Sequence, residues 1–178
     1  MSHDLFSSLD SFVAASSAAS SLLVRDVAGE YRPAEADEVL QAAQRVLAGS
    51  VRGTDVLTSP AVVKDFLRVR LGNLPHEIFA VVHLDAQHRV LDYVEMFRGT
   101  VSQTLVYPRE VVKDALSRNS SALLLVHNHP SGSPEPSRAD EFLTQTLKSA
   151  AALVDVRVLD HLIVAGDSVL SMAERGLM

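Results

Sequence analysis

Two runs of apolar residues in the second half of the chain constrain its fold more than any other feature. Glu77–Leu84 (EIFAVVHL) and Ser121–Val126 (SALLLV) are dense in apolar and β-branched residues, without regular polar alternation. A strand of this composition is typically covered on both faces, because a half-exposed strand carries polar residues at every second position. The two runs therefore predict buried strands in a central sheet with helices on both sides.

The segments around these runs alternate between helical and extended patterns. Apolar stripes at helical spacing predict helices over residues 59–72, 108–116 and 137–150. We expect the remaining strands over residues 89–97, 104–107, 156–164 and 169–171. Such alternation predicts one α/β domain, which we assign to residues 57–178.

The first 56 residues have a different character, and we interpret them as an N-terminal extension that is partly helical or disordered. Ser7–Ser21 is rich in Ser and Ala, a composition that does not decide between these states. Pro33 then opens a stretch with apolar residues at helical spacing, which predicts a helix ending at Gly49.

The composition excludes several classes of protein. The chain has no Cys, which rules out a disulfide scaffold, thiolate catalysis and Cys-based zinc sites, whereas its seven His can bind a metal. The net charge of −6 disfavours a basic nucleic-acid surface. No apolar run approaches the roughly 20 residues of a membrane-spanning helix. Acidic residues precede Arg25, the first basic residue, as in neither secretory nor transit signals. We therefore expect a soluble, cytoplasmic protein.

The segment Val126–Asp140 (VHNHPSGSPEPSRAD) carries the candidate chemistry. It leaves a buried strand through His127 and His129, and in an extended backbone residues i and i+2 point to the same side. Asp140, in the first turn of the next helix, brings a carboxylate from the far end of a Pro-rich loop. Two imidazoles, one carboxylate and an open position are the ligand set of a catalytic zinc site.

Simpler interpretations exist for each part of this segment. Ser137-x-x-Asp140 is also an ordinary helix-capping pattern, and an isolated His pair is more often part of a polar loop. The combined pattern fixes five residue types, which chance produces at roughly 10⁻⁶ per starting position. Capping and metal binding are also compatible in one helix.

The pattern His127-x-His129-Pro130-x7-Ser137-x-x-Asp140 resembles the zinc motif of JAB/MPN (JAMM) metallopeptidases, and the surrounding residues resemble the RadC family in particular. The resemblance covers about residues 57–178; the preceding residues do not match the helix-hairpin-helix region of longer RadC proteins. It implies a mixed β-sheet flanked by helices, broadly similar to cytidine deaminases. It also implies one Zn²⁺ per chain on His127, His129 and Asp140.

The same resemblance implies a zinc-dependent hydrolase that cuts a peptide or isopeptide bond in a protein substrate. Glu77, at the start of the first core strand, is then the general base, with Glu95 as the rival candidate. Ser137 is expected to hydrogen-bond the polarised carbonyl or the bound water. His161 lies in an apolar strand, where a core histidine and a residue supporting the metal site are both open.

Two other functions follow from weaker signals. The RadC family carries a DNA-repair label, which makes a nucleic-acid-linked protein with an accessory or unused metal site the alternative. The acidic balance and the absence of a Lys/Arg cluster weigh against it. A zinc deaminase is disfavoured because its Pro-Cys-x-x-Cys ligands are missing.

Overall fold

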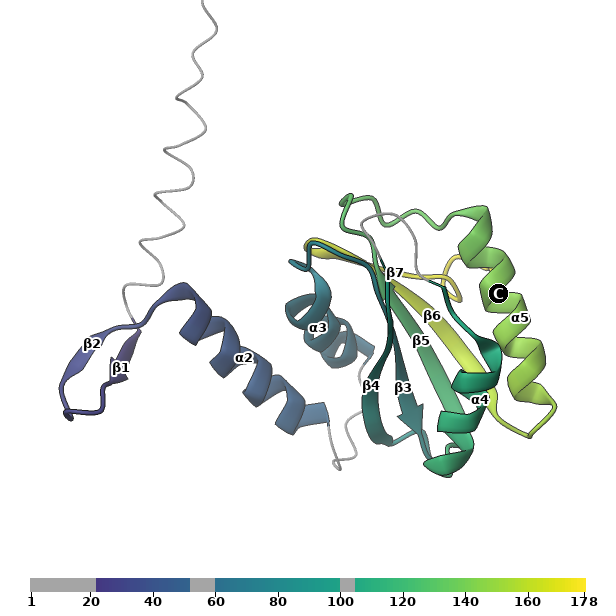
Figure 1. The fold of residues 1–178 in the computed structure, drawn as a ribbon, viewed down its shortest axis with the longest axis horizontal. Helices are drawn as coiled ribbons and strands as arrows, with labels where there is room; N and C mark the ends of the chain where they lie inside the picture. Colours follow the sequence, from purple (N-terminus) through teal and green to yellow (C-terminus); the bar gives the residue numbers. More distant parts are fainter. Residues whose placement is uncertain (1–21, 52–59, 100–104) are drawn as a thin grey trace, which may run out of the picture. The chain divides into compact units, whose positions relative to one another are not determined.

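A five-stranded mixed sheet forms the centre of the computed structural model, which describes residues 22–51, 60–99 and 105–178 (Figure 1). The spatial order is β4-β3-β5-β6-β7, with strands β3 (Ile78–Leu84), β4 (Val90–Arg98), β5 (Ala122–Asn128), β6 (Arg157–Ala165) and β7 (Ser168–Ser171). Only β5 and β6 are parallel neighbours; the other pairs are antiparallel. A parallel pair requires a crossover, which helix α5 (Arg138–Ala152) supplies.

Helices cover both faces of this sheet, as the apolar strands require. Alternate residues of β3 enter two separate cores, because successive side chains of a strand point to opposite faces. Ile78 and Ala80 pack with α3 (Pro60–Leu71), while Phe79 and Val81 pack with α4 (Pro108–Ser117) and α5. In Figure 1, α3 lies on one side of the sheet and α4 and α5 lie on the other. The predicted fold class, a mixed sheet flanked by helices, is confirmed.

The end of α3 approaches the turn between β6 and β7 closely. A Cβ atom on Gly72 would lie 2.5 Å from the carbonyl oxygen of Gly166 and 2.6 Å from that of Arg68. Both are backbone atoms with little freedom to move. Glycine at position 72 therefore permits the approach between helix and turn.

The chain divides into two compact units, Met1–Val46 and Leu47–Met178. In the first, β1 (Leu23–Arg25) and β2 (Tyr31–Pro33) form an antiparallel hairpin that the sequence did not indicate. The following helix α2 (Ala36–Val51) begins three residues after Pro33 and continues through Gly49, so both predicted ends were wrong. The Ser7–Ser21 segment lies outside the described residues, and the division at residues 56 and 57 stays a prediction.

The other expected elements of the larger unit occur within a few residues of their predicted bounds, with one exception. Leu105–Tyr107, the described part of the strand expected over 104–107, forms no strand. Tyr107 has an extended backbone (φ −101°, ψ 110°) because the following proline disfavours helical conformation in the residue before it. Within the described residues, no helix has the length and apolar character needed to cross a membrane.

Candidate metal centre

The candidate metal-binding motif joins the end of β5 to the start of α5. His127 is the penultimate residue of β5, and the backbone amide of His129 donates to the Val164 carbonyl of β6 at 2.8 Å. Gly132 then turns the chain with a φ of 79°, a conformation that disfavours residues with a side chain. The loop ends at Ser137, the N-cap of α5.

Asp140 closes the loop through the capping box expected from the sequence. The Ser137 hydroxyl accepts a hydrogen bond from the Asp140 amide at 3.2 Å and donates to Asp140 Oδ2 at 2.7 Å. The Ser137 amide donates to the same Oδ2 at 2.7 Å. These bonds satisfy backbone groups at the helix start and fix the orientation of the Asp140 carboxylate.

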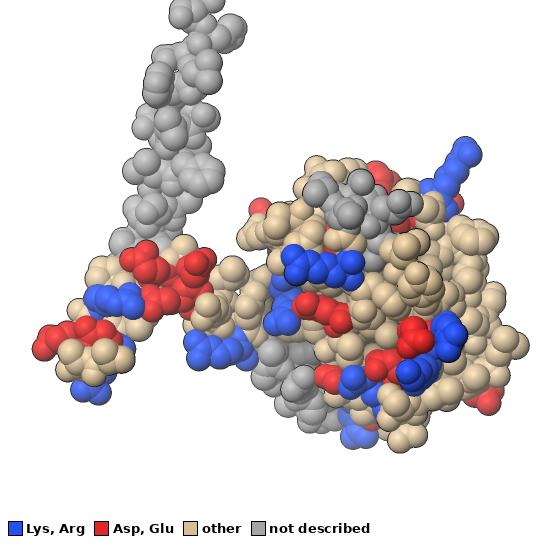
Figure 2. Space-filling model, in the orientation of Figure 1, with Lys and Arg blue, Asp and Glu red and all other residues tan. Residues whose placement is uncertain are grey.

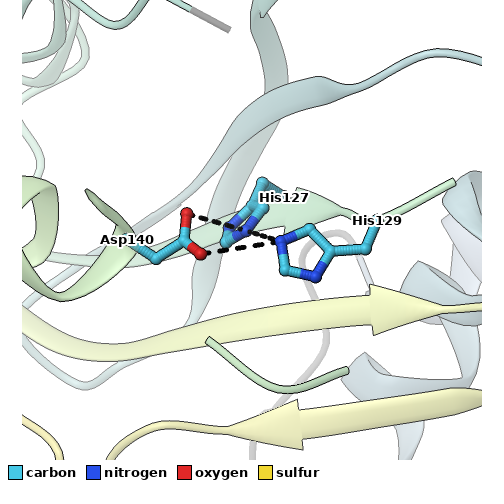
Figure 3. A group of neighbouring side chains, drawn as sticks. All are labelled: His127, His129 and Asp140. Carbon is cyan, nitrogen blue, oxygen red and sulfur yellow. Dashed lines mark hydrogen bonds and ion pairs between the residues drawn. The ribbon is translucent and has the colours of Figure 1, made fainter. Parts of the chain in front are cut away.

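The side chains of His127, His129 and Asp140 point toward one another (Figure 3). The Nε2 atoms of the two histidines are 2.8 Å apart. Asp140 Oδ1 lies 3.3 Å from His127 Nε2, and Oδ2 lies 3.6 Å from His129 Nε2. Among the described residues, this is the one group of three or more His, Asp or Glu side chains placed to hold a metal.

The donor atoms of this group suit a zinc ion. His129 Nδ1 lies 2.8 Å from the Ser133 carbonyl oxygen, which can only accept, so Nδ1 carries a proton and Nε2 is the nitrogen that could bind a metal. In a tetrahedral zinc site with bonds of ~2.0–2.1 Å, adjacent ligand atoms lie about 3.3 Å apart. The two His–Asp separations match this spacing, while the His–His separation is shorter. Two nitrogens and one oxygen leave a fourth position open.

The protonation equilibria of His127 and Asp140 also favour a metal ion. Burial lowers the pKa of His127 to about 4, which keeps the imidazole neutral at pH 7. The hydrogen bond to Asp140 raises the pKa of His129, so at this side chain a proton competes with a metal ion. Burial alone would raise the pKa of Asp140, but the interactions with His129, His127 and Ser137 outweigh it and hold that pKa well below its usual value. Asp140 is therefore a carboxylate, which is the form that binds metals.

A cleft of about 570 Å³ opens beside the three side chains. Glu77 lines it together with His127, His129, Asp140 and Ser137. Phe79 pairs with His127 across β3 and β5, so in this antiparallel register Glu77 comes level with His129. The negative charge of Glu77 also contributes to the raised pKa of His129. The structure thus brings all five predicted site residues to one cleft.

The rival base, Glu95, lies elsewhere. Its carboxylate accepts a hydrogen bond from Arg70 of α3 at 2.9 Å, and Glu95 does not line the cleft. Glu135 does line the cleft, but it pairs with Arg175 at 3.3 Å. Of these carboxylates, only Glu77 both lines the cleft and comes level with His129 in the β3–β5 register.

Three residues around the site were missed or left open by the sequence. Asn128, between the two histidines, accepts from the Ile78 amide at 2.7 Å and donates to the His76 carbonyl at 3.0 Å. It thereby holds the backbone on both sides of Glu77. His161 and Thr144 lie behind His127 and have no exposed surface. Thr144 follows Asp140 by four residues, so helical periodicity was a usable signal for it.

Comparisons with known proteins identify the family of this chain. Residues 57–177 match the RadC-like JAB domain family. The chain belongs to this family. A UPF0758 protein of Leptothrix cholodnii is 57% identical over 150 residues, which is 84% of this chain and 68% of that protein. A UPF0758 protein of Methylibium petroleiphilum is 59% identical over the same shares.

The similarity to these relatives extends beyond the RadC-like JAB domain itself, because their alignments of 150 residues are longer than the matched range 57–177. A UPF0758 protein of Aromatoleum aromaticum is 52% identical over 174 residues, or 97% of this chain and 76% of that protein. The similarity therefore reaches into the N-terminal segment, whereas the sequence motifs placed it in residues 57–178 alone. The names of these relatives specify no activity.

Proposed function

We propose that this RadC-like JAB domain is a zinc-dependent hydrolase of peptide or isopeptide bonds, with one Zn²⁺ per chain. The observation that carries the proposal is the convergence of His127, His129 and Asp140 at a cleft that Glu77 also lines. Three ligands and an open side characterise catalytic zinc sites, whereas structural sites are closed by four protein ligands.

The roles of the side chains follow from their places in the cleft. His127, His129 and Asp140 would hold the ion, which when bound supplies a Lewis acid that polarises a carbonyl and lowers the pKa of water. Glu77, which lines the cleft, would accept a proton from the attacking water and return it to the leaving amine. The Ser137 hydroxyl, which donates to Asp140 in this structure, remains our candidate for contact with the substrate carbonyl.

The walls of the cleft favour a peptide over a nucleic acid. Phe79, Val106 and Leu143 supply apolar surface, while none of the described lining residues is Lys or Arg. An amide bond carries no charge, but a phosphodiester needs cations to offset its own. On the face shown in Figure 2, basic and acidic side chains of the larger unit are interspersed, without a broad basic patch. These observations weigh against the nucleic-acid alternative.

Metal analysis of the purified chain tests the zinc site. We expect one zinc per chain after reconstitution, and its loss in both His127→Ala and Asp140→Ala. His88→Asn is the matched control, because His88 lies in a turn with a φ of 62°, which Asn adopts readily. Failure of the unsubstituted chain to bind zinc would overturn the proposal.

Cleavage of a proteome-derived peptide library, read by mass spectrometry of new termini, tests the reaction. Zinc-loaded protein should produce new termini, and Glu77→Gln should produce none while keeping its zinc. Ubiquitin-type isopeptides form a second substrate set. No cleavage of either set by the zinc-loaded chain would refute hydrolase activity, and full activity of Glu77→Gln would refute the role of Glu77.

A further inference from the structure

A chain of two buried side chains lies directly behind the candidate ligands. His127 Nδ1 is 2.8 Å from His161 Nε2, and His161 Nδ1 is 2.6 Å from Thr144 Oγ1. Thr144 Oγ1 is in turn 2.6 Å from the backbone carbonyl oxygen of Asp140. These hydrogen bonds thus connect the candidate ligand His127 on β5, through His161 on β6 and Thr144, to the candidate ligand Asp140 on α5.

The proton positions in this chain follow from its last member. The Asp140 carbonyl oxygen can only accept, so the Thr144 hydroxyl must donate to it. With its single proton committed, Thr144 Oγ1 can only accept from His161, so His161 Nδ1 carries a proton. His161 has no exposed surface and lies 5.9 Å from the Phe79 ring, an environment that disfavours a charged imidazole. Its Nε2 atom therefore keeps a lone pair.

The same reasoning reaches the ligand. His161 Nε2 can only accept, so His127 Nδ1 must carry the proton of that hydrogen bond. In a neutral imidazole the other nitrogen is then unprotonated. That nitrogen is His127 Nε2, which faces Asp140 and His129. Each hydrogen bond in this series is donated in the direction from His127 through His161 and Thr144 to the Asp140 carbonyl. The lone pair that remains free is on His127 Nε2, the atom that would bind the metal.

On the basis of the proposed zinc site, we propose that Thr144 and His161 are positioning residues that fix the Nδ1–H tautomer of His127 and so prepare Nε2 for zinc. Removal of the Thr144 hydroxyl would free His161 to carry its proton on Nε2 and donate to His127 Nδ1. His127 would then hold a proton on the nitrogen that must bind the metal. A hydroxyl that touches no ligand side chain thereby controls ligand chemistry.

The first experiment reads the tautomer in the metal-free chain. Long-range ¹H–¹⁵N correlation spectra at mildly alkaline pH distinguish a protonated Nδ1 from a protonated Nε2 for each histidine. We expect Nδ1–H for His127 and for His161. An Nε2–H tautomer for either histidine would overturn the proposal. This measurement needs neither zinc nor a substitution, so it stands even if the chain proves not to bind zinc.

The second experiment measures zinc affinity by competition with a chromophoric chelator. Loss of a residue that orients a histidine ligand typically weakens metal binding by about 10- to 100-fold, and we expect this loss in Thr144→Val. Thr144→Ser retains the hydroxyl and should restore the affinity. The matched control is Thr146→Val, because Thr146 donates to the Phe142 carbonyl of the same helix at 2.8 Å, without contact to His161.

The outcomes separate this inference from the proposed function. Zinc binding by Thr144→Val as tight as by Thr146→Val would overturn the positioning role of Thr144 and His161 but leave the proposed zinc site intact. Absence of zinc binding in the unsubstituted chain would instead overturn the proposed function. If Thr144→Val fails to fold, His161→Phe tests the same step, because it removes the group that accepts from His127 Nδ1. Weaker zinc binding by His161→Phe than by Thr146→Val would support the proposal, and equal zinc binding would contradict it.

Discussion

Asn128 offers the sharpest test of how the site is built, because its side chain holds the segment that carries Glu77. Its amide bonds to the Ile78 N–H at 2.7 Å and to the His76 carbonyl at 3.0 Å, and the residue is 1% exposed. Asn128→Ala removes both bonds without disturbing any candidate metal ligand. We expect the variant to keep its zinc, to lose stability, and to leave the Glu77 backbone less well fixed.

The structure sets the size of the loss. A buried polar group left without its partner costs about 1–3 kcal/mol. Ile78 is 5% exposed, so its N–H should bear most of that penalty, whereas the half-buried His76 carbonyl can recover part of it from water. The sum is about 2–4 kcal/mol in the free energy of unfolding. Urea denaturation of the metal-free chain measures it.

Amide hydrogen exchange adds a local measurement to this global one. The Ile78 amide should exchange slowly in the unsubstituted chain and much faster in Asn128→Ala. Asn119→Gly is the control, since Asn119 has a φ of 52° that glycine adopts without strain. A loss below about 1 kcal/mol, or an Ile78 amide that stays as protected as before, would refute this account of Asn128.

Three further substitutions test other parts of the structure. Gly72→Ala should cost about 1–3 kcal/mol in thermal denaturation, because its Cβ would meet backbone atoms at 2.5 Å and 2.6 Å; a loss near zero would show that α3 shifts freely. Ser137→Ala should cost about 1 kcal/mol as a lost N-cap and weaken zinc binding by releasing Asp140, whereas Ser137→Thr should retain both in urea and chelator titrations. Burial lowers the pKa of His83, so below about pH 6.5 the unfolded chain binds a proton that the folded chain does not. Stability should therefore fall as the pH drops below that value, by up to about 1.4 kcal/mol per pH unit, and His83→Gln should reduce this slope in urea titrations from pH 7 to 5.

The sequence predicts the sheet well because burial on both faces leaves a visible composition. The continuous apolar runs at β3 and β5 are typical of strands that are covered on both faces. The β1–β2 hairpin leaves no such mark, since its strands are largely exposed and one of them is Tyr31-Arg32-Pro33. Its turn depends on Asp26, whose side chain accepts from the Ala28 and Glu30 amides at 2.9 Å.

The errors at Gly49 and Leu105–Tyr107 have different physical origins. A glycine inside a helix costs only about 1 kcal/mol relative to alanine, so it weakens the helix without ending it. Leu105 and Tyr107 are apolar and Tyr107 is extended, but both are exposed and neither has a strand partner. Local conformation was right for Tyr107, while pairing depends on the rest of the fold.

The residues of the candidate site also differ in how far the sequence reveals them. His127, His129 and Asp140 come from one continuous segment of 14 residues, so their spacing is visible in the sequence. Glu77 and His161 reach the site through strand pairing: β5 lies between β3 and β6 in the sheet. Residues that meet across a sheet leave no fixed spacing along the chain. Sequence alone therefore supplied the candidate ligands but not the contacts that orient them.

The alternation of β5 explains why an amide residue stands between the two histidines. His127 and His129 point to the face covered by α5, so Asn128 points to the opposite face by the geometry of a strand. There the regular β3–β5 pairing ends at Phe79 and His127, and the Asn128 amide continues it by bonding to the backbone on either side of Glu77. One tripeptide thus supplies candidate metal ligands to one face and fixes the backbone around the candidate base from the other. An apolar residue at position 128 would still be buried, but it would form neither hydrogen bond to the backbone beside Glu77. The fold therefore requires only a buried side chain at this position, whereas the proposed reaction requires the amide.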